Sequence, residues 1–311
     1  MLRALITTAL LFALPALADE VTLHTPSGDL HGTYQGMGTG PVVLMIAGSG
    51  PTNRNGNATA MGLNTDMYKL LADGLMTAGI RSLRTDKRGV GESRGALTAE
   101  KDLTIQTYAD DVQAWAAQLR KTSGAPCVWL LGHSEGALLA EMVAQQDKAI
   151  CGLVLVAGPG RPLGWILREQ MHANPANPPQ LLEQFEAILS QLEVGHADFE
   201  VPPPLAVLFR PSVQPYLISE LTLDPAAMLA KTRLPVLILQ GETDLQVSPA
   251  DAKLLAAAKP DAKLMLVPGA NHLLKSAPAD RAGNITTYTN PTLPLAPSVV
   301  DAITQFIKSH P

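Results

Sequence analysis

The chain has 311 residues, of which 46% are hydrophobic and 16% are charged, so it is long enough to bury a large core. Its 28 acidic residues outnumber its 23 basic residues and only 4% of its residues are aromatic, which argues against a nucleic-acid-binding protein. Its two cysteines are too few for a disulfide scaffold or for a structural zinc site built from cysteines.

Residues 1–18 have the layout of a secretory signal peptide. A short start with Arg3 is followed by an apolar run at 4–14, and small residues at Ala16 and Ala18 suit a cleavage site. The run is shorter than the ~20 residues that a membrane-spanning helix needs. We therefore expect cleavage near Ala18, a mature chain that is periplasmic or secreted, and no stable membrane insertion after cleavage. An uncleaved membrane anchor is the alternative interpretation.

Strands and helices are predicted to alternate along the rest of the chain. Two short segments around a turn predict an opening hairpin, and continuous apolar runs are typical of strands buried on both faces. The hairpin covers residues 21–25 and 30–35, and the further strands cover 41–47, 80–85, 127–131, 151–157, 235–240 and 263–267. Helical spacing of apolar residues predicts helices over 66–78, 104–120, 135–146 and 298–308. This alternation predicts a mostly parallel α/β sheet with helices on both faces.

Residues 158–234 depart from this alternation. They contain no clear strand, a proline-rich piece, and one amphipathic helical segment at 181–192. We expect a helical cap here, over one end of the sheet. It would be inserted between a first part of the core at 19–157 and a second part at 235–311. An ordinary surface excursion is the alternative.

Two pentapeptides match the pattern G-x-S-x-G, in which a serine can be raised as a nucleophile on a sharp turn between a strand and a helix. Ser134 follows the predicted strand at 127–131 and precedes a helical segment. Ser93 follows residues 86–90, which do not read as a strand. We therefore predict that Ser134 is the nucleophile and that Ser93 is a structural loop residue.

A serine hydroxyl needs a base to take its proton, and the chain has seven histidines. His272 is the preferred base because it follows the predicted strand at 263–267 in a turn. His133 directly precedes Ser134, so its side chain should project elsewhere. The remaining histidines lie in the opening hairpin, in the predicted cap or at the C-terminus, and a surface histidine is the alternative role for His272.

The acid that orients the base should follow a strand and lie between the serine and the histidine in the chain. The strand predicted at 235–240 is followed by two acidic residues, Glu242 and Asp244. Asp244 is our first choice and Glu242 the second. Asp251 is the third, because it falls in the next predicted helix.

Negative charge develops on the substrate carbonyl oxygen during acyl transfer, so backbone donors are expected near Ser134. One is the N–H of Glu135, the residue after the nucleophile, at a helix N-terminus. The second should come from the loop at 48–51, whose small residues allow a close approach of the backbone. We favour the N–H of Ser49, and a tight turn without a donor role is the alternative.

These motifs occur in the order typical of the α/β-hydrolase superfamily, and the chain resembles its bacterial carboxylesterase and serine-aminopeptidase-like branch. The matching segments are 48–51, 86–93, 132–136, 241–244 and 271–272. The resemblance runs from about residue 41 to residue 272, with the final helix, and implies the α/β-hydrolase fold. It does not cover the cap. In that branch the loop often reads G-P-T-D-R-D-G-N, whereas Asn53 and Asn55 stand here in place of both acids.

The sequence therefore predicts an exported serine hydrolase, in first place a carboxylesterase for small or medium acyl esters. A peptidase or a thioesterase could use the same residues, and a non-catalytic binding protein on the same fold is an alternative of another class. We expect no cofactor and no metal, because the chain carries no complete dinucleotide motif, no phosphate loop and no pair of histidines at metal spacing. The expected partner is a small-molecule acyl ester and not a nucleic acid, and the oligomeric state is not predicted.

The Glu135 carboxylate would oppose a developing oxyanion unless a neighbour neutralised it. We predict that it pairs with, or accepts a hydrogen bond from, the segment 52–57, with Arg54 as the nearest cation. The alternative is a glutamate that is simply favourable in a first helical turn.

Cys127 and Cys151 begin two predicted strands, each at the same distance in sequence from its strand end. If these strands are parallel neighbours, ~4.8 Å apart, both cysteines lie level within reach of a disulfide. An exported protein meets an oxidising compartment, so we predict a Cys127–Cys151 disulfide at the sheet edge away from Ser134. Two buried free thiols are the alternative.

Overall fold

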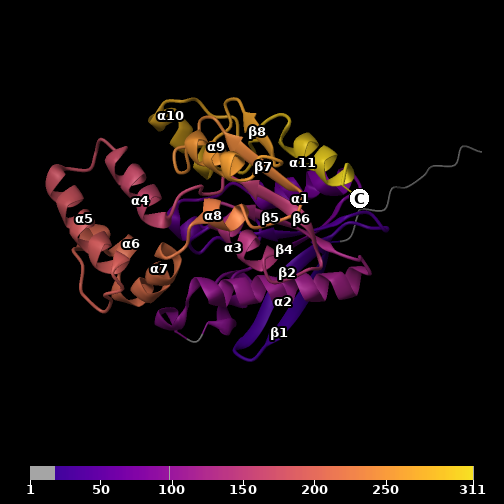
Figure 1. Ribbon diagram of the computed structural model, residues 1–311, viewed down its shortest axis with the longest axis horizontal. Coiled ribbons are helices and arrows are strands. Elements are labelled where there is room, and N and C mark those ends of the chain that lie inside the picture. The colour runs from indigo at the N-terminus through magenta and orange to yellow at the C-terminus, as the bar shows by residue number, and fades with distance from the viewer. Residues whose placement is uncertain (1–17, 98, 311) are drawn as a thin grey trace, which may run out of the picture.

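An eight-stranded sheet forms the centre of the computed structural model, which describes residues 18–97 and 99–310 (Figure 1). The strands are β1 (Ala18–Thr25), β2 (Gly28–Gln35), β3 (Val42–Ile46), β4 (Arg81–Thr85), β5 (Val128–His133), β6 (Ile150–Val156), β7 (Val236–Gly241) and β8 (Lys263–Val267). Their order is β1-β2-β4-β3-β5-β6-β7-β8. The β1–β2 hairpin is antiparallel and β2 is antiparallel to β4, whereas all other neighbours are parallel. The predicted α/β sheet is confirmed, and residues 1–17 of the predicted signal peptide lie outside the described residues.

Two helical layers cover the sheet, and alternating side chains of each central strand reach one layer or the other. In β3, Val43 and Met45 belong to one apolar cluster, whereas Leu44 and Ile46 belong to the cluster on the opposite face. The first layer contains α1 (Met67–Thr77) and α11 (Val299–Lys308), and the second contains α2 (Ile105–Ser123), α3 (Glu135–Ala144), α8 (Pro225–Leu229) and α9 (Pro249–Ala258). This double burial explains why the central strands read as continuous apolar runs.

Four helices between β6 and β7 extend beyond one end of the sheet (Figure 1). They are α4 (Leu163–His172), α5 (Pro179–Glu193), α6 (Ala206–Phe209) and α7 (Gln214–Leu221). They enclose a separate small apolar cluster around Phe185, Leu189 and Phe209. No strand occurs between residues 158 and 234 of the described chain. The last helix of this stretch, α8, packs on α3 and α9 and thus on the core.

The remaining elements are short. They are α10 (Arg281–Thr286) and the 3-10 turns η1 (Thr59–Met61), η2 (Gly91–Ala96), η3 (Glu100–Asp102), η4 (Pro203–Leu205), η5 (Pro211–Val213) and η6 (Thr287–Thr289). None of the helices formed by residues 18–97 and 99–310 combines the length and the apolar character that crossing a membrane requires.

The predicted disulfide is present. Cys127 and Cys151 are bonded, with their Cα atoms 5.2 Å apart. Cys127 directly precedes β5 and Cys151 is the second residue of β6, where the register of the two parallel strands shifts. The bond therefore joins the two strands at the end of the sheet opposite the strand-to-helix turn at Ser134.

Glu141, on α3, is a buried carboxylate without a hydrogen-bond partner. Its side chain is 2% exposed, and neither oxygen meets a donor among the described residues. Burial, and to a smaller extent Asp224, raises the pKa of Glu141 well above its ordinary value. The folded state therefore keeps a proton that the unfolded state releases near pH 4.5, so the free energy of unfolding falls as the pH rises above that value.

We expect Glu141→Leu to raise the free energy of unfolding by about 1–3 kcal/mol at pH 8, because it removes an unsatisfied buried polar group. The gain should be smaller at pH 4, where the wild-type side chain is protonated in both states. Urea unfolding at both pH values measures the difference. Glu183→Leu, at an exposed position on α5, is the matched control. An equal gain at pH 4 and pH 8 would contradict ionisation as the cause.

Candidate active site

Ser134 lies on the sharp turn between β5 and α3. Its φ is 55°, a conformation that is strained for a residue with a side chain. Gly132 and Gly136 leave no room for a side chain. A Cβ at Gly132 would lie 2.1 Å from the carbonyl oxygen of Gly136, and a Cβ at Gly136 would lie 2.3 Å from that of Ile46. The G-x-S-x-G pattern thus produces the raised serine that the sequence predicted at this position.

Ser93, the serine of the second G-x-S-x-G pentapeptide, is buried and bonded to backbone groups, as expected of a structural loop residue. Its side chain is fully buried, its hydroxyl accepts the N–H of His31 at 2.8 Å, and it donates to the carbonyl of Asp86 at 3.0 Å. The hydroxyl therefore holds β2 against the loop after β4.

His272 and Asp244 form a buried pair at the ends of two neighbouring strands. His272 Nδ1 lies 2.8 Å from Asp244 Oδ2, and the two side chains are 4% and 0% exposed. Asp244 Oδ1 accepts the backbone N–H groups of Gln246 and Val247 at 2.7 and 3.0 Å. Burial raises the pKa of Asp244, but His272 and these two N–H groups together hold it below its ordinary value. The carboxylate is thus ionised and fixes the proton of His272 on Nδ1, which leaves Nε2 as the free base.

The two other acids considered lie elsewhere. Glu242 is exposed. Asp251 is fully buried on α9, where it accepts from the N–H of Gly160 and pairs with Arg161. It anchors the segment that follows β6 to α9.

One cavity of about 260 Å³, which we call the Ser134 cavity, brings Ser134 and His272 together with Ser49. Its other walls include apolar side chains from two segments, Ala58, Met61, Leu63, Met67 and Leu273. No hydrogen bond joins the Ser134 hydroxyl to a described residue. Such bonds commonly tighten only when a substrate is bound.

A chain of hydrogen bonds that the sequence did not predict joins four residues that line this cavity. The N–H of Gly48 donates to the hydroxyl of Tyr68 at 3.0 Å, and that hydroxyl lies 2.9 Å from His133 Nδ1. His133 Nε2 lies 2.8 Å from the carbonyl oxygen of His272. Because a carbonyl only accepts, His133 Nε2 carries the proton. Burial, followed by the charge of His272, lowers the pKa of His133 to about 3, so the ring is neutral and Tyr68 donates to Nδ1.

Lys87 fixes the other side of the 48–51 loop. Its Nζ donates to the carbonyl of Gly48 at 2.6 Å and lies 3.6 Å from Glu135 Oε1. The Gly48 carbonyl and the Ser49 N–H belong to one trans peptide and point in opposite directions. The N–H of Ser49 therefore points away from Lys87, and Ser49 stays our predicted second donor. The N–H of Glu135 opens α3, where a first-turn N–H has no partner within the helix.

The prediction that Glu135 pairs with, or accepts a hydrogen bond from, the segment 52–57 is wrong. Its carboxylate lies beside Lys87 and is 6% exposed. Arg54 is held by other acids: Asp86 accepts its N–H at 2.7 Å and its Nε at 3.0 Å, and Glu20 and Glu92 pair with its terminal nitrogens. Asp86, which lies directly after β4 and is 3% exposed, thus binds Arg54 through two hydrogen bonds, and the cation beside Glu135 is Lys87.

The described residues contain no cluster of three or more His, Cys, Asp or Glu side chains that could hold a metal ion.

Known proteins share this architecture. The sequence profile of the Alpha/beta hydrolase family matches residues 43–282. Esterase EstD from Thermotoga maritima is 30% identical over 248 residues, which cover 78% of this chain but 56% of that protein, so the chain spans little more than half of that relative. Est1E from Butyrivibrio proteoclasticus superposes with a TM-score of 0.61 at 15% identity, over 94% of this chain and 98% of that one. A thermophilic esterase from Thermogutta terrifontis gives 0.58 at 20% identity, over 94% and 100%. The profile match and this fold show that the chain belongs to the alpha/beta hydrolase family, as its motifs predicted.

Proposed function

We propose that this protein is an exported serine hydrolase that cleaves carboxylic esters through an acyl-enzyme on Ser134. The observation that carries the proposal is the buried Asp244–His272 pair, whose histidine opens into the same cavity as the raised serine. The relation to Esterase EstD supports an ester as the substrate class. Apolar walls of the Ser134 cavity suit an alkyl or acyl chain of modest length.

In the proposed mechanism each group has one task. His272 Nε2 takes the proton of Ser134 Oγ as this oxygen attacks the ester carbonyl. Asp244 stabilises the imidazolium that forms. The N–H groups of Glu135 and Ser49 donate to the oxyanion of the tetrahedral intermediate. His272 then gives its proton to the leaving alcohol, and a water molecule, activated by the same nitrogen, releases the acid.

Export is supported by two features of the chain. The layout of residues 1–18 is that of a cleavable leader, and the Cys127–Cys151 bond suits a compartment that keeps disulfides oxidised. We propose a periplasmic or secreted mature form that begins at Asp19.

The proposal is tested by substrate class and by covalent labelling. p-Nitrophenyl esters of graded acyl length should be hydrolysed, with higher kcat/KM than acyl thioesters or aminoacyl amides that offer the same acyl group. An alkyl fluorophosphonate should add once per chain, at Ser134, as located by mass spectrometry of peptides. Labelling at another serine, or hydrolysis of amides alone, would contradict the esterase proposal.

Lys87 should assist catalysis through the peptide that it holds. We expect Lys87→Met to lower kcat for a p-nitrophenyl ester about 10- to 100-fold with little change in KM, because the cation both orients and polarises the Gly48–Ser49 peptide. Affinity for a trifluoromethyl ketone, which forms a tetrahedral adduct, should fall by a similar factor.

The single variant leaves Glu135 buried without a cation, so Lys87→Met with Glu135→Gln is made alongside it. The double variant keeps the loss of kcat while relieving the unpaired charge. Lys87→Arg should recover part of kcat. A loss of thermal stability without change in kcat or in ketone affinity would show that Lys87 is merely structural.

A further inference from the structure

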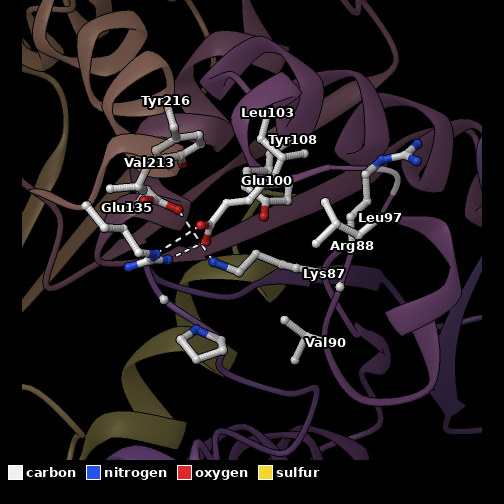
Figure 2. A pocket seen from close by; sticks show the side chains of 14 residues that line it. Lys87, Arg88, Val90, Leu97, Glu100, Leu103, Tyr108, Glu135, Val213 and Tyr216 are labelled. Carbon is white, nitrogen blue, oxygen red and sulfur yellow. Dashed lines mark hydrogen bonds and ion pairs between the residues drawn. The ribbon is translucent and has the colours of Figure 1, made fainter. Parts of the chain in front are cut away.

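A second cavity, of about 200 Å³, lies between the cap and the core and shares Gly50 and Pro51 with the Ser134 cavity. Figure 2 shows Tyr216, from α7 of the cap, across from Lys87 and Val90, which follow β4. Glu135, the neighbour of Ser134 in the chain, points into it. The second cavity therefore adjoins the turn that carries the nucleophile, on the other side of the 48–51 loop.

The charges that line the second cavity are paired. Each cation lies beside a carboxylate, as Lys87 with Glu135 at 3.6 Å, Arg88 with Asp111 at 2.6 Å and Arg210 with Glu100 at 2.9 Å. Glu220 is also buried on α7, and burial followed by Glu135 raises its pKa well above its ordinary value, which favours its uncharged form. The groups around the second cavity thus sum to about zero charge, so an ion of either sign would lose hydration without gaining an unpaired partner.

Two buried polar atoms at the second cavity form no hydrogen bond with a described residue, although Lys87 Nζ lies 3.6 Å from one of them. They are the hydroxyl of Tyr216 and Oε1 of Glu135, on residues that are 8% and 6% exposed. Buried polar atoms are nearly always hydrogen-bonded, so these two point to a group that enters the cavity. The carboxylate oxygen accepts only, whereas the tyrosine hydroxyl can donate or accept. A ligand hydroxyl serves both, because it donates to one and accepts from the other.

The rest of the wall is apolar. Val90, Leu97, Leu103 and Val213 line the second cavity beside these polar atoms. Polyols and sugars present both kinds of surface, since their C–H groups pack on aliphatic side chains while their hydroxyls need donors and acceptors.

We propose that the second cavity is a subsite for an uncharged, hydroxyl-rich part of the ester substrate, of the glycerol or sugar type, while the apolar part occupies the Ser134 cavity. This proposal rests on the ester hydrolysis proposed above. The hydroxyls can belong to the alcohol half or to the acyl half of the ester, because the second cavity recognises the same chemistry in both. The experiment has one arm for each source.

The first measurement compares matched esters. Glycerol monobutyrate against propyl butyrate places the hydroxyls on the alcohol, and ethyl 2,3-dihydroxypropanoate against ethyl propanoate places them on the acid. We expect wild-type kcat/KM to be at least about 10-fold higher for the hydroxylated member of one pair, as two hydrogen bonds of ordinary net strength would give. Tyr216→Phe should lower that value about 3- to 10-fold and leave the plain ester within about 2-fold.

Tyr34→Phe is the matched control, since Tyr34 lies on β2 and lines neither cavity. Tyr34→Phe should leave the ratio of kcat/KM between the two members of each ester pair unchanged. Equal kcat/KM within both pairs, or an equal effect of Tyr216→Phe on both members of a pair, would overturn the subsite. A clear preference for choline butyrate over glycerol monobutyrate would overturn its neutral character.

Binding without turnover separates the subsite from the proposed function. Saturation-transfer NMR of methyl glucoside and of glycerol is recorded on the Ser134→Ala protein. We expect transfer to at least one of them, and its loss when Tyr216→Phe is added. Absence of transfer overturns the subsite. If the wild type hydrolyses no ester while transfer persists, only the proposed esterase function fails and the cavity is still a polyol site.

Discussion

Ser134→Ala is expected to lower kcat/KM for p-nitrophenyl butyrate by about 10⁵-fold or more while the protein stays folded, because no other group can form the acyl-enzyme. His272→Ala should cost about as much, since nucleophile and base act as one unit. Asp244→Asn should cost less, about 10³- to 10⁴-fold, because the base is still present but no longer held with its proton on Nδ1. Initial rates and circular dichroism of the three variants measure these losses.

Ser93→Ala is the matched control, because it removes the serine of the second G-x-S-x-G pentapeptide. Its hydroxyl satisfies the buried N–H of His31. We expect nearly full activity and a loss of about 1–2 kcal/mol in the free energy of unfolding. Most of the activity surviving in Ser134→Ala, or an inactive but folded Ser93→Ala protein, would refute the assignment of the nucleophile.

The double variant Cys127→Ala with Cys151→Ala is expected to lose about 3 kcal/mol in the free energy of unfolding, since the bond closes a loop between cysteines 24 residues apart. Activity at 25 °C should persist, because the bond lies at the sheet end opposite Ser134. Urea unfolding and ester hydrolysis, measured on the same preparation, give both quantities.

Reduction offers an independent control for the disulfide. Wild-type protein kept in excess dithiothreitol should unfold at the same urea concentration as the double variant, and dithiothreitol should not affect the double variant. Thiol titration of denatured, unreduced wild type should find none. Two thiols per chain, or equal stability of the oxidised and reduced forms, would show that the bond plays no part in stability.

The strands of the central sheet could be predicted because each is marked by the apolar pattern of its own short segment. Strands buried on both faces, such as β3, β5 and β6, read as apolar runs. β5 ends at His133, and the small residues Ala47 and Ala157 directly follow β3 and β6. Parallel strands bring their carboxyl ends to one edge. The positions of Ser134, Asp244 and His272 in the turns that follow β5, β7 and β8 were therefore enough to propose that they meet.

The supports of this site could not be predicted, because they depend on contacts between distant segments. Tyr68 and His133 are 65 residues apart, and His133 and His272 are 139 apart. No periodicity connects them. The partner of Glu135 depended in the same way on contacts between distant segments, since Asp86 binds Arg54 and Lys87 is the cation beside Glu135.

The segment between β8 and α11 also escaped prediction, for a different reason. Its helix α10 is short and contains glycine and threonine, which are weak helix formers. Side-chain hydrogen bonds hold the segment instead: Asp280 caps the helix through the N–H of Gly283, and Asn284 donates to the carbonyl of Thr243. Such polar stabilisation leaves no apolar pattern in the sequence.

Arg54, which was predicted to lie beside Glu135, instead connects β1 to the loop beside the Ser134 cavity. Arg54 forms an ion pair with Glu20 on β1, and the same glutamate accepts a hydrogen bond from the hydroxyl of Thr33 on β2 at 2.8 Å. A ragged amino terminus that lacked Glu20 would leave Arg54 with Asp86 and Glu92 and would loosen a loop far away in sequence. Batch-to-batch differences in specific activity would then trace to amino-terminal trimming. A recombinant form should therefore keep Glu20, with any affinity tag placed after α11, where Lys308 is exposed.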